Sequence, residues 1–265
     1  MIMKKIIWIL SFIGILTVVV FNGEKVIADE MEDFLSKYAL TGEDLDKFEE
    51  NELRQNQQRS SKSFDLETLR DQYEQYRELG IFDEEVTFEI YVQLATTPPP
   101  TDTVAPEFRS VAGNPQAGDI LITNGTSLGG LTGHAGIFLG TLGNGGILSI
   151  QGPGYKPEVI GIFEWMRRYS GTNRWTKLYR PTSQYRPTDA ARWAKNNYEF
   201  KNYSYGINMK IFEKDPTYCS KIVWQAYWYS SAAAQVGGMY QPLIASPYDL
   251  PNYFDKRPTH VATWQ

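Results

Sequence analysis

The sequence holds very few of the residues from which disulfides and metal centres are built. Its 265 residues include one cysteine, Cys219, and two histidines, His134 and His260. One cysteine cannot form an internal disulfide or a multi-cysteine zinc site, so we expect no metal and no other cofactor. The net charge of −5 argues against a nucleic-acid-binding chain. Apolar residues make up 42% and aromatic residues 14%, which is enough for a sizeable core.

Long apolar runs are also scarce, and the one that occurs lies near the N-terminus. Residues 1–28 open with two lysines, continue as an apolar run over 6–21, and end in Val26-Ile27-Ala28. This layout predicts a secretory signal peptide. An uncleaved membrane anchor is the alternative, because the run approaches the length of a short span. We therefore expect a secreted or cell-wall-associated protein with no stable membrane insertion after cleavage.

The remaining chain divides into three regions by composition. Residues 29–95 carry 19 acidic and seven basic side chains at helical spacing, which predicts an acidic helical domain. Residues 96–106 (TTPPPTDTVAP) predict a stiff proline-rich linker. Residues 107–265 show short strand patterns and glycine turns, and we expect them to form a catalytic domain. Because residues 96–265 have a net charge of +5, the acidic segment is able to dock onto them. The sequence leaves the role of that segment open.

Cys219 is the most informative residue for chemistry. It follows Asp215-Pro216-Thr217, which indicates a helix start, and it precedes an aromatic-rich apolar stretch. A thiolate in the first turn of a helix is stabilised by the free amide hydrogens and the helix dipole, so we expect a lowered pKa. The alternative is a buried, inert cysteine.

His134 and Gln151 are the candidate partners of this thiol. His134 starts a predicted strand directly after Thr132-Gly133, which places the ring at the margin of a sheet, where it can act as a base. Asn144-Gly145-Gly146 predicts the turn of a hairpin. Positions 134 and 151 lie symmetrically about that turn, so Gln151 is expected opposite His134, where its amide can orient the ring.

Five segments carry a resemblance to a known family. They are GDILITNG (118–125), GHAGIFLG (133–140), ILSIQGPG (147–154), YSYGIN (203–208) and YCSKIVWQAY (218–227). Together they resemble the circularly permuted NlpC/P60 papain-like superfamily, in its YiiX/YebB-like branch, where the histidine strand precedes the cysteine helix. The resemblance extends over about residues 113–255.

The resemblance implies a fold, an activity and a set of site residues. The fold class is α+β, a papain-like domain with a small antiparallel sheet or open barrel packed on the cysteine helix and preceded by a helical segment. Cys219 is then the nucleophile, His134 the base and Gln151 the orienting residue, with Tyr218 and Tyr205 lining a substrate pocket. Gln151-Gly152 departs from the acidic residue and alanine of many members. The implied reaction is amide or peptide cleavage in bacterial peptidoglycan through an acyl-enzyme.

Two other functions fit the same residues. Related folds with the same order of histidine and cysteine include acyltransferases and lipid or ester hydrolases, and the aromatic residues Trp224 and Tyr227 suit an apolar entry to such a site. A secreted binding module with a degenerate site is the non-enzymatic alternative, favoured by Gln151 and by the acidic helical segment.

Overall fold

The protein was analysed as a computed structural model, which describes residues 29–61, 65–125, 133–230 and 238–265. The expected signal peptide at 1–28 lies outside the described residues. Within the described ranges, none of the helices is both long enough and apolar enough to cross a membrane.

The centre of the molecule is a six-stranded antiparallel sheet with strand order β4-β3-β2-β1-β5-β6. Helices flank it, so the α+β class predicted from the sequence is confirmed. The strands are β1 Ile120–Thr123, β2 His134–Phe138, β3 Gly146–Ser149, β4 Glu158–Gly161, β5 Thr176–Arg180 and β6 Thr259–Trp264.

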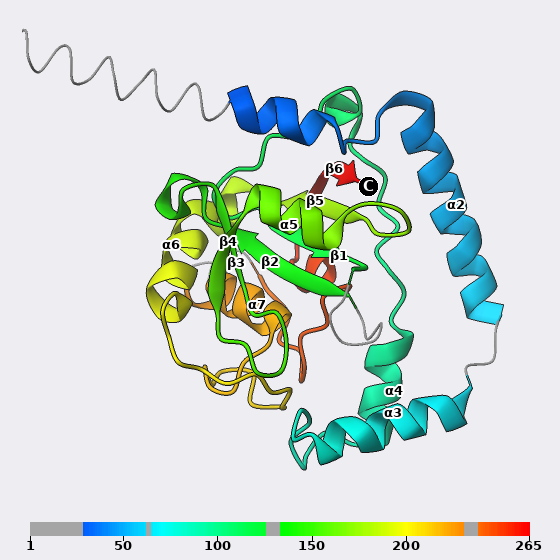
Figure 1. The fold of residues 1–265 in the computed structure, drawn as a ribbon, viewed down its shortest axis with the longest axis vertical. Coiled ribbons are helices and arrows are strands. Elements are labelled where there is room, and N and C mark those ends of the chain that lie inside the picture. The colour runs from blue at the N-terminus through cyan, green and yellow to red at the C-terminus, as the bar shows by residue number, and fades with distance from the viewer. Residues whose placement is uncertain (1–28, 62–64, 126–132, 231–237) are drawn as a thin grey trace, which may run out of the picture.

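Helices lie on both faces of the sheet and make up most of the described N-terminal region (Figure 1). The described chain begins in a helix at 29–36. The α-helices that follow are α2 Gly42–Ser61, α3 Leu66–Glu78, α4 Phe88–Thr96, α5 Ile162–Tyr169, α6 Pro187–Tyr198 and α7 Cys219–Tyr229. Short 3-10 helices are η1 Pro106–Phe108, η2 Gly140–Gly143, η3 Ser183–Tyr185 and η5 Leu250–Tyr253.

The two faces of the sheet are buried against different helices. Side chains alternate along β1, so that Ile120 and Ile122 belong to one apolar cluster and Leu121 to the other. The first cluster includes α7 and α6, which pack on β2. The second includes Trp165 of α5 and the final residue of β6, Trp264. β2 begins with His134. Because helices pack on both faces of the sheet, the position of β2 is fixed by the close packing around it.

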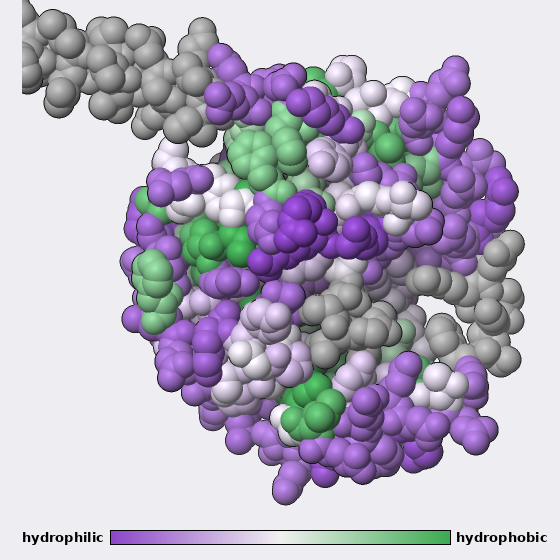
Figure 2. Space-filling view, viewed as in Figure 1, coloured by the Kyte–Doolittle hydropathy of each residue, from purple (hydrophilic) through white to green (hydrophobic). Residues whose placement is uncertain are grey.

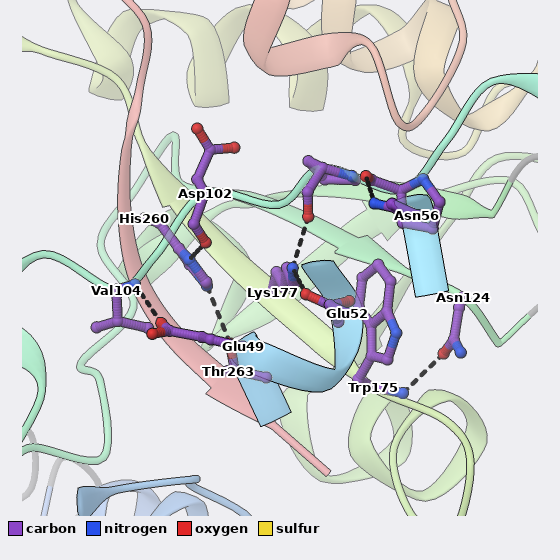
Figure 3. Close-up of polar contacts among 12 residues, drawn as sticks. Glu49, Glu52, Asn56, Asp102, Val104, Asn124, Trp175, Lys177, His260 and Thr263 are labelled. Atoms are coloured by element: carbon purple, nitrogen blue, oxygen red, sulfur yellow. Dashed lines mark hydrogen bonds and ion pairs between the residues drawn. The ribbon is translucent and has the colours of Figure 1, made fainter. Parts of the chain in front are cut away.

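Helix α2 lies along one side of the sheet domain and is joined to it by buried polar contacts (Figure 3). Lys177 of β5 forms an ion pair with Glu52 of α2, and its ammonium also donates to the Pro100 carbonyl at 2.6 Å. Glu49 accepts from the backbone N–H of Val104 at 2.7 Å. The proline-rich stretch thus runs between α2 and the sheet and bonds to both.

Helices α3 and α4 form a hairpin with its own aromatic cluster. Tyr73, Tyr76, Phe82 and Tyr91 lie with ring centroids 5.5–6.3 Å apart. Tyr76, Phe82 and Tyr91 are buried in the same apolar cluster that contains α7. The helical segment and the sheet domain therefore share one core rather than packing as two separate cores.

The face of the molecule seen in Figure 2 is largely hydrophilic, and its apolar patches are small and separate. Strongly hydrophilic side chains gather over α5, whose last turn carries Arg167 and Arg168. Arg168 donates to Glu164 of the same helix at 2.6 Å and to Gln151 at 3.1 Å. The contact with Gln151 connects this surface to the site described next.

Candidate active site

One cleft brings together the five residues that the sequence singled out. Cys219, His134, Gln151, Tyr205 and Tyr218 all line it, and its cavity volume is about 50 Å³. The thiol and the imidazole therefore reach the same cleft although they are 85 positions apart in the chain. Their catalytic roles remain predictions, since what the structure establishes is their placement.

Cys219 is the first residue of α7 and is only 7% exposed. Tyr218 occupies the N-cap position in an extended conformation, without a capping side chain. Burial raises the pKa of the Cys219 thiol, and hydrogen bonding to the backbone of Ala135 and Ser220 offsets part of that rise. The lowered pKa expected from the helix N-terminus is therefore wrong, because loss of solvation dominates at this buried thiol.

His134 is buried between two aromatic rings at the start of β2. It is 4% exposed, and its ring centroid lies 5.4 Å from that of Trp165 and 4.8 Å from that of Tyr169. Burial lowers the pKa of His134 from 6.5 to about 3, and the positive charge of Arg168 acts in the same direction. The imidazole is consequently neutral at physiological pH, which is the state that a general base requires.

Ser149 sets the tautomer of this imidazole. Its Oγ lies 3.1 Å from Nε2 of His134 and donates its hydrogen to the Ala135 carbonyl at 2.6 Å. Because a hydroxyl has one hydrogen to give, Ser149 accepts from Nε2–H of His134. The proton of the neutral ring is thus on Nε2, and Nδ1 carries the basic lone pair.

Gln151 lines the cleft with His134 and bonds a charged side chain of α5. The β2–β3 ladder pairs Ile137 with Leu148 and Phe138 with Ile147, which is the register predicted from the turn. However, β3 ends at Ser149, and the Gln151 Oε1 accepts from Arg168 at 3.1 Å. The ring contacts Ser149, the diagonal neighbour two residues earlier on the same face of the sheet. The alternation that pointed to position 151 also marks position 149, so the signal for Ser149 was present in the sequence.

Tyr218 and Tyr205 hold the wall of the cleft beside the thiol. The Tyr218 hydroxyl accepts from the backbone N–H of Ala245 at 3.0 Å. Tyr205 forms an isolated parallel bridge with Thr217. Burial raises the pKa of both tyrosines, so each hydroxyl stays protonated. Ser220 completes the connection by donating to the Ala245 carbonyl at 2.7 Å. The loop before η5 is thereby fastened to the first turn of α7.

The helical segment forms the opposite wall, which the sequence did not reveal. Tyr76, Ile81, Phe82 and Leu94 of the α3–α4 hairpin line the cleft. A short parallel bridge anchors them, because Ile207 donates to the Ile81 carbonyl at 2.7 Å and accepts from Asp83 N–H at 3.0 Å. The acidic segment therefore contributes apolar side chains to the site.

A second hollow, with a cavity volume of about 500 Å³, lies on the other side of the loop that carries Tyr248. Its lining is more polar and includes Asn51, Glu52 and Asn124 together with Trp175. Tyr248 packs against Gly133, the residue before His134: a Cβ added at Gly133 would lie 2.3 Å from the Tyr248 ring. Gly133 also has a φ of +76°, which favours glycine.

Metal ligands do not cluster in the part of the chain that the structure describes. No group of three or more His, Cys, Asp or Glu side chains comes together there.

Comparison with known proteins identifies the family and corrects the resemblance. A family model described as lipoprotein N-acylation protein LnsA-like matches residues 86–260, more than half of the chain. An uncharacterized 30.3 kDa protein of Bacillus thuringiensis is 35% identical over 159 residues, covering 56% of this chain and 57% of that protein. The chain thus aligns with little more than half of this relative. No solved structure matches the chain.

The resemblance to the NlpC/P60 superfamily is therefore wrong as an assignment, and so is the cell-wall peptidase expected from it. The matching family model is a different one, and its description concerns lipoprotein acylation rather than peptidoglycan. No fold neighbour supports a papain-like architecture. The match includes β1 to β5, α5 to α7, Cys219 and His134. The chain belongs to the lipoprotein N-acylation protein LnsA-like family.

Proposed function

We propose that this protein is a thiol-dependent acyltransferase that acylates the amino group of a lipoprotein. The observation that carries the proposal is the pairing of a buried thiol, Cys219, with a neutral imidazole, His134, in one largely apolar cleft. The family description supplies the reaction class. This reaction is the acyltransferase alternative that the sequence left open, and the apolar wall from α3 and α4 favours it.

The first half of the reaction loads the enzyme. Nδ1 of His134 takes the proton of Cys219, and Sγ attacks the carbonyl carbon of an ester-linked acyl donor. The new C–S bond forms, the C–O bond breaks, and His134 returns the proton to the departing alcohol. Backbone N–H groups in the first turn of α7 stabilise the oxyanion, a contribution of about 3 kcal/mol per donor in comparable sites.

The second half transfers the acyl group to nitrogen. A neutral amino group attacks the thioester, the C–N bond forms and the C–S bond breaks. His134 takes the proton that the amine loses and passes it to the Cys219 thiolate, which restores the starting state. Water competes with the amine for the same thioester. The apolar wall of Ile81, Phe82 and Leu94 favours the amine by limiting access of water.

A resting thiol and a neutral base suit this chemistry. The pKa of Cys219 is raised and that of His134 is lowered, so the pair is uncharged until a donor arrives. An uncharged pair loses little free energy when an apolar chain displaces water from the cleft. We place the reaction at an extracytoplasmic membrane surface, where lipoproteins and acyl lipids meet, in keeping with the apolar run at residues 6–21.

The test uses the full chain, phospholipid vesicles as donor, and a synthetic peptide whose N-terminal cysteine carries a diacylglyceryl group and a free amine. Mass spectrometry measures the acyl mass added to Cys219 and to the peptide. We expect both additions with the wild-type protein and neither with Cys219→Ala. Ser36→Ala, at an exposed serine, controls for effects of substitution and purification that do not involve the thiol. Undiminished peptide acylation by Cys219→Ala would overturn the proposal.

A further inference from the structure

Ser246 carries a buried hydroxyl that has no hydrogen-bond partner. The residue precedes η5, lines the cleft that contains Cys219 and is 2% exposed. Four buried side-chain atoms in the described part of the chain lack a partner, and Ser246 is the one of these residues that lines the cleft. Buried hydroxyls are normally paired, because an unpaired one loses its hydration without compensation. This hydroxyl points to a partner that the substrate supplies.

The backbone beside this hydroxyl is firmly held. The N–H of Ser246 donates to the Tyr253 hydroxyl at 3.0 Å. The preceding residue, Ala245, accepts from Ser220 at 2.7 Å and donates to the Tyr218 hydroxyl at 3.0 Å. Ser220 and Tyr218 flank the thiol-bearing residue in the sequence. The segment that carries the unpaired hydroxyl is therefore clamped to both sides of the nucleophile.

The space that the hydroxyl and the thiol share is small and carries no fixed charge. Its cavity volume is about 50 Å³, and the described residues that line it include no Asp, Glu, Lys or Arg. This space suits a carbonyl group rather than a charged headgroup. A serine hydroxyl has one hydrogen to donate, so an acceptor oxygen satisfies it. The bond becomes stronger when that oxygen gains negative charge in a site with little water.

We propose that Ser246 is a catalytic residue whose hydroxyl donates to the carbonyl oxygen of the acyl group as that oxygen becomes negative. The proposal rests on the proposed function and adds a side-chain donor to the N–H groups of α7, whose N-cap residue Tyr218 supplies no capping side chain. When Sγ of Cys219 attacks, the C–S bond forms and the π electron pair of the carbonyl moves onto oxygen. The pair returns as the alcohol departs.

The same oxygen becomes negative a second time when the amine attacks the thioester. The C–N bond then forms, and the electron pair returns from oxygen as the C–S bond breaks. A donor fixed beside the thiol therefore stabilises the tetrahedral intermediates of both half-reactions. Because Ser246 meets the charged oxygen only during reaction, its removal should lower the maximal rate and leave the ester concentration for half-saturation unchanged.

The experiment compares two reactions of the same thiol in the full chain. Acylation of Cys219 by p-nitrophenyl acetate passes through an oxyanion, whereas alkylation by iodoacetamide displaces iodide and forms none. Ser246→Ala should slow acylation by roughly 100-fold, as removal of one oxyanion donor does elsewhere, and leave the alkylation rate unchanged. Ser230→Ala, at a serine that is also 2% exposed and follows the end of α7, should leave both rates unchanged. Equal slowing of both reactions by Ser246→Ala, or undiminished acylation, would overturn the assignment.

Two further measurements need no turnover. Because the hydroxyl has no partner among the described residues, Ser246→Ala should not lower the melting temperature, and a marked fall would assign the hydroxyl a structural bond instead. Labelled acetaldehyde adds to Cys219, with the C–S bond forming and the carbonyl oxygen taking the thiol proton. Carbon-13 NMR measures this addition, which Ser246→Ala should weaken. A wild-type thiol that no ester acylates would overturn the proposed function. Equal aldehyde binding by wild type and Ser246→Ala would overturn the role of Ser246.

Discussion

The hydroxyl of Ser149 lies 3.1 Å from Nε2 of His134 while donating its hydrogen to the Ala135 carbonyl at 2.6 Å. This pair fixes the ring in one tautomer through a neutral serine, where many thiol enzymes use a carboxylate or an amide. A neutral partner stabilises a positive imidazolium less than a carboxylate does. It suits a base that is charged only during proton transfer.

The first prediction concerns this hydroxyl. Ser149→Ala should slow acylation of Cys219 by roughly 10- to 100-fold, a part of the 10²–10⁴-fold that a positioned base contributes. Gln151→Ala is the matched comparison and should have a smaller effect, because the described contact of its Oε1 is with Arg168. Ser149→Thr keeps the hydroxyl and should restore most of the rate. A larger loss in Gln151→Ala than in Ser149→Ala would assign the orienting role to the amide.

The second prediction concerns the pH dependence of the thiol. Because burial raises the pKa of Cys219, the thiolate fraction at pH 7 is smaller than that of an ordinary cysteine, whose pKa is about 8.5. The rate of alkylation by iodoacetamide should therefore increase with pH through a midpoint above 8.5. The same protein unfolded in urea should show the ordinary midpoint. The pH midpoint is the quantity to compare between the folded and unfolded protein. Restricted access of iodoacetamide to the thiol lowers the maximal rate but leaves the midpoint unchanged.

A midpoint below pH 7 in the folded protein would contradict this prediction. It would indicate a thiolate–imidazolium pair in the resting state, and His134 would then carry a proton at neutral pH. Burial lowers the pKa of His134 to about 3, so we expect no such pair.

The third prediction concerns the ion pair that joins α2 to the sheet. Lys177 is 1% exposed and Glu52 11% exposed at their side chains. Replacing Glu52 by Leu leaves a buried ammonium with the Pro100 carbonyl as its remaining described acceptor and should lower the free energy of unfolding by about 3–5 kcal/mol. Adding Lys177→Met to this variant should recover most of the loss, because no charge is then left alone.

The control for this cycle is the exposed pair between Lys47 and Glu43, also on α2. Glu43→Leu should change the free energy of unfolding by less than about 1 kcal/mol, since solvent screens that pair. Urea denaturation measures the three variants and the wild-type protein. If Glu52→Leu is as mild as Glu43→Leu, the buried pair does not hold α2 in place.

The sequence predicted the features that depend on local pattern. The α+β class, the hairpin around Asn144 and Gly145, and the helix that starts at Cys219 all follow from turn residues and periodicity. The meeting of Cys219 and His134 in one cleft follows from the strand-end position of one and the helix-start position of the other. These are properties that a few neighbouring residues determine.

The features that were missed depend on tertiary packing. The pKa of Cys219 was predicted from the helix dipole alone, but its direction is set by how deeply α7 is buried. The contact between Ser149 and His134 depends on where β3 stops pairing, which the turn does not encode. The family was misassigned because short strand and helix motifs specify a geometry of thiol and base, and that geometry serves several reactions.

The contact between Gly133 and Tyr248 separates the cleft at the thiol from the polar hollow beside α2. The phenol ring acts as a partition one residue away from the base. With the phenol in place, a molecule with an apolar tail and a polar head has a separate compartment for each part, and the sulfur of Cys219 lies in the apolar one. Tyr248→Ala would remove the ring that divides the two compartments.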